Sequence, residues 1–99
     1  MSKTTVRVVA RVVALPEKEE EVKSVLLGLI EPTRQESGCI QYELLQNQEH
    51  PTDFVFVEEW ENEALLNAHL ESPHINDVDA KLNGLLATEP DIQFYRLLA

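Results

Sequence analysis

The stretch FVFVEEWENEALLNAHLESPHI, from Phe54 to Ile75, decides the fold of this chain. Its first seven residues alternate as in a β-strand, which places Phe54, Phe56, Glu58 and Trp60 on one face. The residues that follow have the apolar spacing of a helix. A carboxylate, an indole and two imidazoles therefore lie within one strand–helix unit. If they converge on one cavity, they make a small-molecule site.

The segments on either side complete the order strand, helix, strand, strand, helix, strand. The expected strands are Thr5–Leu15, Cys39–Leu45, Phe54–Trp60 and Asp91–Leu98. The first expected helical segment runs from Pro16 to a glycine stop at Gly38, with a kink or break at Pro32. The second covers Glu63–Leu70. The third begins at Pro73 and carries Ile75, Val78, Leu82 and Leu85 at helical spacing. This order predicts an α+β, ferredoxin-like βαββαβ fold with a four-stranded antiparallel sheet, in one domain over residues 1–99.

One face of the predicted sheet has no helix to cover it. In the second strand Ile40, Tyr42 and Leu44 share a face. On the face away from the helices, the first and third strands place the β-branched residues Val9, Val13, Val55 and Val57. Because so much apolar surface needs cover, we expect two copies to pair sheet to sheet as a homodimer.

Composition excludes several partners. Lys and Arg total 8 against 18 for Asp and Glu, a net charge of -10. Binding of nucleic acid or of an anionic membrane surface needs clustered cations, so neither is expected. The single cysteine cannot form an intrachain disulfide. No signal-peptide pattern and no apolar run of membrane-spanning length are seen, so a cytoplasmic protein is expected.

Four polar or aromatic residues are candidates for a site, and each has a structural alternative. Glu58 beside aromatic rings has a raised pKa if unpaired, or it pairs with one of the arginines Arg7, Arg11, Arg34 and Arg96. Trp60 and Tyr42 are either core residues or walls of an aromatic pocket. His69, four residues after Leu65, lies on the apolar side of its helix and is either a satisfied core histidine or a base.

His74 follows Pro73 at a helix start, where the neutral, proton-accepting ring is favoured. Glu58, His69 and His74 are the residue types of a two-histidine, one-carboxylate metal site. The five-residue spacing with a Ser-Pro break does not put both rings on one helical face, so no metal is expected. Cys39 follows a helix end, where no dipole lowers its pKa, and is expected to be an inert residue.

Nearly the whole chain resembles the antibiotic biosynthesis monooxygenase (ABM) domain family, in particular its small quinol-monooxygenase-like bacterial members. The resemblance rests on the following residues in this order and spacing: Pro32-Thr33-Arg34, Glu36-Ser37-Gly38-Cys39, Tyr42-Glu43-Leu44, Phe56, Glu58, Trp60, His69 and Ser72-Pro73-His74. It implies a dimeric α/β-barrel-type assembly of ferredoxin-like subunits. It also implies a pocket in each subunit between sheet and helices.

The resemblance further implies oxidation of a quinol or phenolic aromatic substrate by O2 with no flavin or metal cofactor. A deprotonated, electron-rich phenol can give an electron to oxygen directly, so the protein supplies a base, hydrogen bonds and a dry slot. On this interpretation Trp60, Phe56 and Tyr42 form the slot, and His69 or His74 accepts the proton. Glu58 orients a histidine and Arg34 steadies an anionic oxygen.

Two other activities of the superfamily are disfavoured. Haem-degrading relatives use an asparagine in the first strand, where this chain has Ala10. A relative that isomerises a phosphorylated sugar needs cationic phosphate partners, of which this acidic chain has few beyond Arg34 and Arg96. Two alternatives stay open: a non-catalytic ligand-binding dimer, and an enzyme that isomerises or degrades a small carbonyl compound or phosphosugar.

Overall fold

The structure, a computed structural model, describes residues 5–99. Its elements follow the expected order, with the second crossover split into two helices and the first split as well. They are β1 (Val6–Val13), α1 (Glu19–Leu27), α2 (Ile30–Arg34), β2 (Cys39–Gln46), β3 (Asp53–Trp60), α3 (Glu63–Leu70), α4 (Pro73–Leu82) and β4 (Asp91–Tyr95). The predicted ferredoxin-like α+β fold is therefore confirmed.

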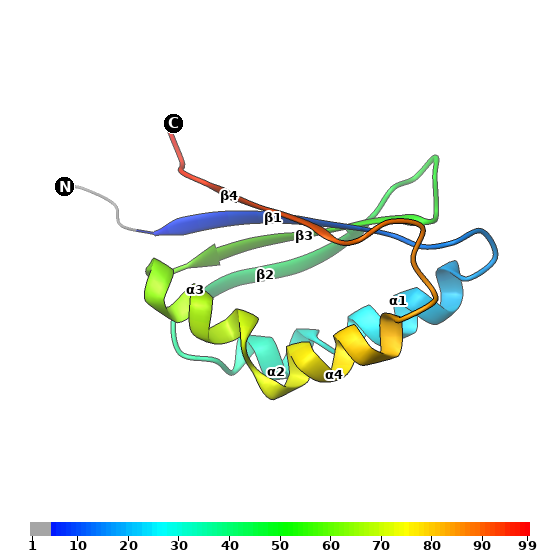
Figure 1. The fold of residues 1–99 in the computed structure, drawn as a ribbon. Coiled ribbons are helices and arrows are strands. Elements are labelled where there is room, and N and C mark those ends of the chain that lie inside the picture. The colour runs from blue at the N-terminus through cyan, green and yellow to red at the C-terminus, as the bar shows by residue number, and fades with distance from the viewer. Residues whose placement is uncertain (1–4) are drawn as a thin grey trace.

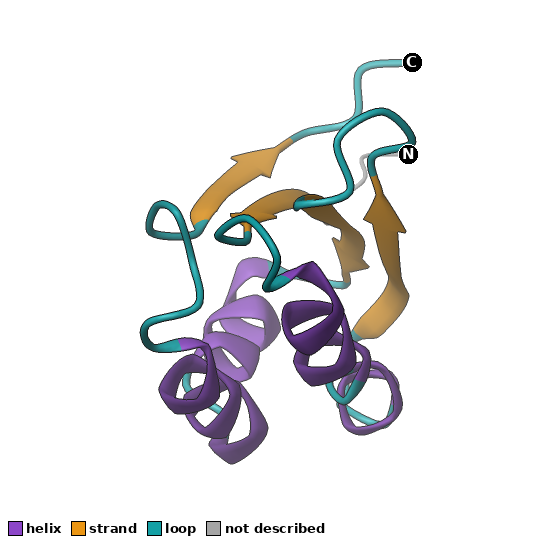
Figure 2. Ribbon diagram, turned by 90° about the vertical axis from the view of Figure 1, so that its right-hand side faces the viewer, coloured by secondary structure: helices purple, strands orange, loops and turns teal. Residues whose placement is uncertain are grey.

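The four strands form one antiparallel sheet in the order β2-β3-β1-β4. All four helices lie on the same side of this sheet, as Figures 1 and 2 show. The sheet and the helices therefore make two layers, and the core lies between them.

Strand β3 is central to this arrangement, because it pairs with β1 on one side and with β2 on the other. Its side chains alternate between partly exposed and buried along the whole strand. Phe54, Phe56, Glu58 and Trp60 all face the helices and are at most 4% exposed. The expected face assignment of this strand is confirmed, and it brings one carboxylate into the core layer.

The first crossover begins and breaks differently from the expectation. Helix α1 begins at Glu19 rather than at Pro16, because Glu17 has a φ of 73° that a right-handed helix does not accommodate. The break falls at Gly28, before α2, and Pro32 lies in the first turn of α2. A proline ring collides with the carbonyl four residues earlier in a helix, which for Pro32 is that of Gly28.

Strand β2 also departs from simple alternation. The pairing of β2 with β3 shifts register between Cys39 and Gln41, as a β-bulge does. Ile40 lies in this irregularity and is 51% exposed, so its expected place beside Tyr42 and Leu44 is wrong. Cys39 takes the position opposite Trp60 instead. At the other end of the chain, Leu85 lies outside α4, and β4 ends at Tyr95 rather than Leu98.

Two side-chain caps set the turn between the helices of the second crossover. Asn62 accepts a hydrogen bond from the backbone N–H of Leu65 at 2.9 Å and starts α3. Ser72 accepts one from the N–H of Ile75 at 3.4 Å and starts α4, with Pro73 at its first position. Asn and Ser are common helix N-caps, and Pro is favoured at the first helical position. They separate His69 and His74 onto two helices that meet at a sharp corner.

No helix within residues 5–99 covers the opposite face of the sheet (Figure 2). Strand register places Val9, Val55, Leu45 and Tyr95 there, and the last two are more than half exposed. Two ion pairs edge this face: Arg7 with Glu59 at 3.5 Å and Arg11 with Asp53 at 2.9 Å. None of the helices within residues 5–99 is both long and apolar enough to cross a membrane.

Gly38 controls how the strand that follows it approaches α3. Its φ is +85°, and a Cβ built on it would lie 2.9 Å from Cβ of Leu65. We predict that Gly38→Ala lowers the free energy of unfolding by more than Gly84→Ala does. Gly84 has a φ of +84° but nothing within 4 Å, so it isolates the backbone strain of about 1–2 kcal/mol.

Overpacking against Leu65 adds about 1–3 kcal/mol to the cost at Gly38. Chemical denaturation of the two variants measures the difference. Equal losses in both variants would contradict the close approach of Gly38 to α3.

Candidate functional site

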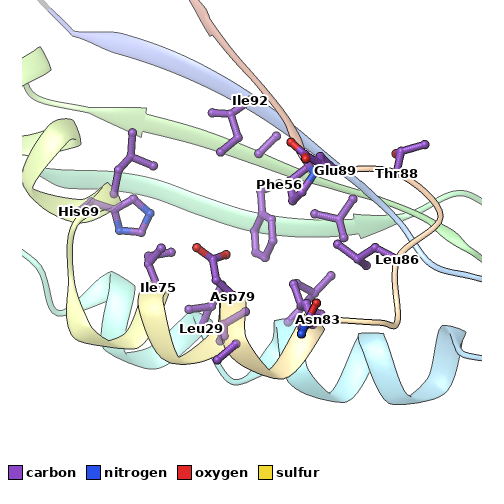
Figure 3. A pocket seen from close by; sticks show the side chains of 18 of the residues that line it. Leu29, Phe56, His69, Ile75, Asp79, Asn83, Leu86, Thr88, Glu89 and Ile92 are labelled. Atoms are coloured by element: carbon purple, nitrogen blue, oxygen red, sulfur yellow. The ribbon is translucent and has the colours of Figure 1, made fainter.

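A cavity of about 1030 Å³ lies between the sheet and α4. Its floor is the inner face of the sheet, and α4 and the segment leading to β4 form the opposite wall (Figure 3). Most of the lining is aliphatic or aromatic, and the polar groups Glu58 and His69 are among the few charged or titratable ones. A mostly apolar cavity with a few converging polar groups is typical of a small-molecule site.

Strand register aligns the residues of the cavity floor. Tyr42 of β2 lies opposite Glu58 of β3, and Leu44 lies opposite Phe56. The rings of Tyr42 and Phe56 stack with centroids 5.0 Å apart at an angle of 29°. Both residues line the cavity, so the expected aromatic surface is present and consists of these two rings.

Glu58 is a carboxylate in the core that contacts an indole rather than a cation. Its Oε1 accepts a hydrogen bond from Nε1 of Trp60 at 2.8 Å, and the residue is 4% exposed. Arg7 and Arg11 pair with Glu59 and Asp53 instead. Burial raises the pKa of Glu58 to about 7, opposed by the Trp60 hydrogen bond. The carboxyl group therefore changes its protonation state near neutral pH.

His69 of α3 lies against the same aromatic cluster. Its ring centroid is 4.6 Å from that of Trp60 and 5.6 Å from that of Tyr42, where the contact is edge-on. The residue is 1% exposed, and it lines the cavity. Burial lowers the pKa of His69, although the neighbouring Glu36 opposes this shift. At neutral pH the ring is therefore uncharged and able to accept a proton.

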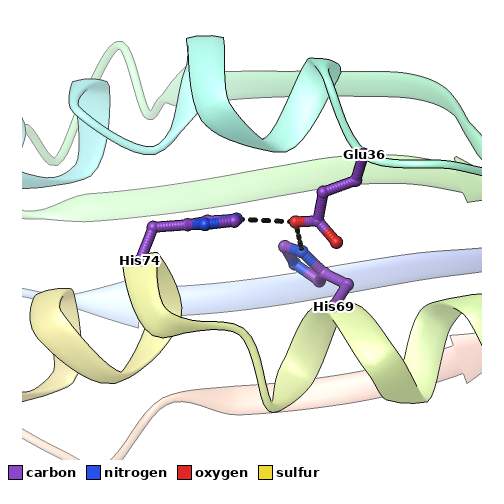
Figure 4. A group of neighbouring side chains, drawn as sticks. All are labelled: Glu36, His69 and His74. Carbon is purple, nitrogen blue, oxygen red and sulfur yellow. Dashed lines mark hydrogen bonds and ion pairs between the residues drawn. The ribbon is translucent and has the colours of Figure 1, made fainter.

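Glu36, in the turn after α2, contacts both histidines. Its Oε2 lies 2.7 Å from Nδ1 of His69 and 2.6 Å from Nε2 of His74. Figure 4 shows the two rings approaching this one oxygen from α3 and α4. The resemblance implies that Glu58 orients a histidine. In the structure the carboxylate that contacts the histidines is Glu36, and Glu58 contacts Trp60.

Glu36, His69 and His74 also form a group that could hold a metal ion. One donor atom from each lies within 4.8 Å of the other two. Two imidazoles and a carboxylate suit divalent transition metals. The spacing places His69 and His74 on different helices, as expected, yet the corner between α3 and α4 still brings both to Glu36. The two contacts have hydrogen-bond lengths, and a metal ion would have to displace the protons in them.

Several predicted residues lie outside the cavity. Trp60 is fully buried behind Glu58 and His69, so it supports these groups and does not form a wall. His74 contacts Glu36 and is not among the lining residues. Arg34 donates to the backbone carbonyl of Tyr42 at 2.8 and 3.2 Å and lines a smaller hollow beside Cys39. Burial raises the pKa of Cys39, consistent with an inert thiol.

Sequence reasoning missed Glu36 as a site residue, although it belongs to the quoted motif Glu36-Ser37-Gly38-Cys39. The signal available was its place two residues before Gly38, in the turn that joins α2 to β2. The wall contributed by α4 and by the chain before β4 was also missed. Most of these residues are apolar or small, with Asp79, Asn83 and Glu89 as larger polar exceptions, and only packing brings them opposite the sheet.

Comparison with known proteins agrees with this fold. The family model described as "Antibiotic biosynthesis monooxygenase" matches residues 5–81. A protein of Synechocystis, named only as the uncharacterized protein sll1783, is 34% identical over 82 residues. That match covers 83% of this chain and 56% of the relative, so the chain spans little more than half of that protein. "Putative monooxygenase YcnE" of Bacillus subtilis is 35% identical over 77 residues, covering 78% of this chain and 81% of the relative.

Solved structures give the same result. A conserved protein of Methanosarcina mazei has a TM-score of 0.87 and 36% identity, covering 95% of this chain and 93% of that one. PA3566 of Pseudomonas aeruginosa has a TM-score of 0.91 and 29% identity, covering 97% of this chain and 96% of that one. With the family model matching residues 5–81, the chain belongs to the antibiotic biosynthesis monooxygenase family.

Proposed function

We propose that this protein is a cofactor-independent monooxygenase that oxidises a quinol or phenolic aromatic molecule with O2. The observation that carries the proposal is the cavity, in which stacked aromatic rings lie next to an uncharged histidine. Membership of the family and the monooxygenase name of the Bacillus subtilis relative support it. Fold alone would not, since one fold carries many activities.

The chemistry uses few protein groups. His69 takes the hydroxyl proton of the substrate, and the resulting phenolate gives electrons to O2. One oxygen atom enters the ring in place of hydrogen and the other leaves as water, so a phenol and O2 yield a quinone and water. The four electrons come from the substrate. Tyr42 and Phe56 hold the ring, and the apolar walls keep water away from the reactive intermediate.

Glu58 supplies a second proton-exchanging group at the same end of the cavity. Burial raises the pKa of Glu58 to about 7 and lowers that of His69, so near neutral pH a large share of Glu58 is protonated and His69 is uncharged. Two titratable groups whose environments favour their neutral forms suit opposite roles. His69 is the base, and the protonated Glu58 donates a hydrogen bond to an oxygen of the substrate or product.

We also propose that two copies pair through the bare sheet face. The apolar side chains there have no cover within the subunit, and the two ion pairs at the margin would form a polar rim. A stable interface buries about 1,200–2,000 Å² in total, which a four-stranded sheet can supply.

Oxygen uptake tests the activity. We predict that the protein consumes O2 with a reduced naphthoquinone such as menadiol in the presence of a chelator. His69→Ala should lower the rate by about 100-fold or more, because a positioned base contributes roughly 100- to 10,000-fold. His50→Ala, at an exposed turn position, is the matched control and should keep the wild-type rate. If no reduced quinone or phenol is consumed above background, the monooxygenase proposal fails; ligand binding without turnover would then favour the non-catalytic alternative.

The pH dependence of stability tests Glu58. Because the pKa of Glu58 in the folded protein, about 7, lies above its ordinary value of 4.5, the folded state binds the extra proton. Glu58 therefore destabilises the protein increasingly as pH rises from 4.5 to about 7, by on the order of 3 kcal/mol. We predict that Glu58→Gln, which keeps an acceptor for Trp60, removes this loss.

The quantity to measure is the difference in unfolding free energy between wild type and Glu58→Gln from pH 5 to 8, in which the opposite contribution of His69 cancels. Glu61→Gln, an exposed change nearby, is the control. A difference that does not change with pH contradicts the raised pKa.

Sedimentation tests the dimer. The chain mass is 11.3 kDa, and we predict a particle of twice that mass at micromolar concentration. Val57→Lys, which places a charge on the bare face, should give a monomer that stays folded. Leu27→Lys, at an exposed position on α1 and away from the sheet, should leave the dimer intact. A monomeric wild type would contradict pairing through this face.

A further inference from the structure

The reaction scheme does not explain the role of Glu36. It comes from the turn after α2 and does not line the cavity, yet its Oε2 is shared by His69 and His74. The three side chains are 18%, 2% and 24% exposed, in the order Glu36, His69 and His74. The cluster therefore extends from His69 in the cavity wall to the partly exposed side chains of Glu36 and His74.

The number of protons in this cluster follows from hydrogen-bond chemistry. An ionised carboxylate only accepts hydrogen bonds, so the ring nitrogen facing Oε2 must carry a hydrogen in each contact. For His69 this nitrogen is Nδ1, at 2.7 Å. A neutral imidazole has a single N–H, so Nε2 of His69 must then hold a lone pair. Within residues 5–99, the side-chain hydrogen bond that His69 makes uses Nδ1, which leaves Nε2 as the free ring nitrogen.

We propose that Glu36 is the positioning residue of this site: it holds His69 in the tautomer with hydrogen on Nδ1, so that Nε2 is the proton acceptor. The catalytic part rests on the proposed function, whereas the tautomer does not. The substrate O–H bond breaks, an N–H bond forms at Nε2, and the electron pair stays on the substrate oxygen. The imidazolium then has Glu36 as its counter-charge at hydrogen-bond distance.

His74 is part of the same device. Its Nε2 donates to the oxygen that receives His69, and the second bond holds the carboxylate in place between α3 and α4. A charge on His74 opposes a charge on His69. Among the other titratable groups near His69, Tyr42 of the sheet contacts its ring edge-on, and Glu58 and Asp79 line the same cavity. Glu36 is therefore the anionic group hydrogen-bonded to His69.

Nitrogen-15 NMR of the histidine rings tests the proposal without a substrate. In wild-type protein with a chelator, we expect His69 to be protonated on Nδ1 and bare on Nε2 throughout the neutral range. In Glu36→Gln we expect a mixture of tautomers and protonation of His69 at lower pH, because the charge that favours its cationic form is gone. Glu31→Gln removes an equal charge from an exposed position on α2 and should change neither signal.

Activity provides the second measurement. With menadiol, Glu36→Gln should lower kcat/KM by about 10- to 100-fold, which is part of what a positioned base contributes. It should also move the acidic limb of the pH profile, where His69 must lose its proton, together with the His69 titration. Hydrogen on Nε2 of His69 in the wild type overturns the proposal, even if the Gln variant fails to fold. An unchanged tautomer and titration in a folded Glu36→Gln also overturns it. A wild type that shows the expected tautomer but consumes no O2 upholds the positioning and refutes only the monooxygenase function.

Discussion

The structure depends on the alternation of β3, the strand that hydrogen-bonds to both β1 and β2. Because side chains alternate strictly across a sheet, the row that puts two phenylalanines and a tryptophan into the core must carry Glu58 with them. Shifting the register by one residue would expose the aromatic rings, so the carboxylate cannot leave the core without loss of the fold. The polar end of the cavity is thus a direct consequence of how the sheet is built.

Once Glu58 is buried, its neighbours determine what it can do. Trp60 gives it one hydrogen bond and no countercharge, which is why its pKa rises to about 7 rather than falling. His69 lies against the same indole and is kept neutral by burial, while Glu36 forms a hydrogen bond with its Nδ1. The result is a carboxyl group that is partly protonated near neutral pH and an uncharged imidazole at one end of an apolar cavity. This pairing allows proton exchange with a bound hydroxyl group in a site that would otherwise repel charge.

The fold was predictable from sequence because its signals are local. Strand alternation, the caps Asn62 and Ser72 and the stop at Gly38 each act within a few residues. The same holds for the inward direction of Phe56 and Glu58. The contact of Glu36 with His69 and His74 joins residues 33 and 38 positions apart, and no periodicity records it. The resemblance implies that Arg34 and Trp60 contact the substrate. In the structure Arg34 donates to the backbone of β2, and Trp60 lies behind Glu58. The break before Pro32 was misplaced by four residues because a proline acts on the carbonyl of the preceding turn.

The central claim is that an aromatic ligand binds over Tyr42 and Phe56 with a hydroxyl group at His69. The most direct measurement is a crystal structure of the protein with menadiol bound under anaerobic conditions. We predict that the ring lies between the sheet and α4, with one hydroxyl oxygen within hydrogen-bond distance of Nε2 of His69. A ring bound outside the cavity, or inside it with both hydroxyl groups directed away from His69 and Glu58, would contradict the claim.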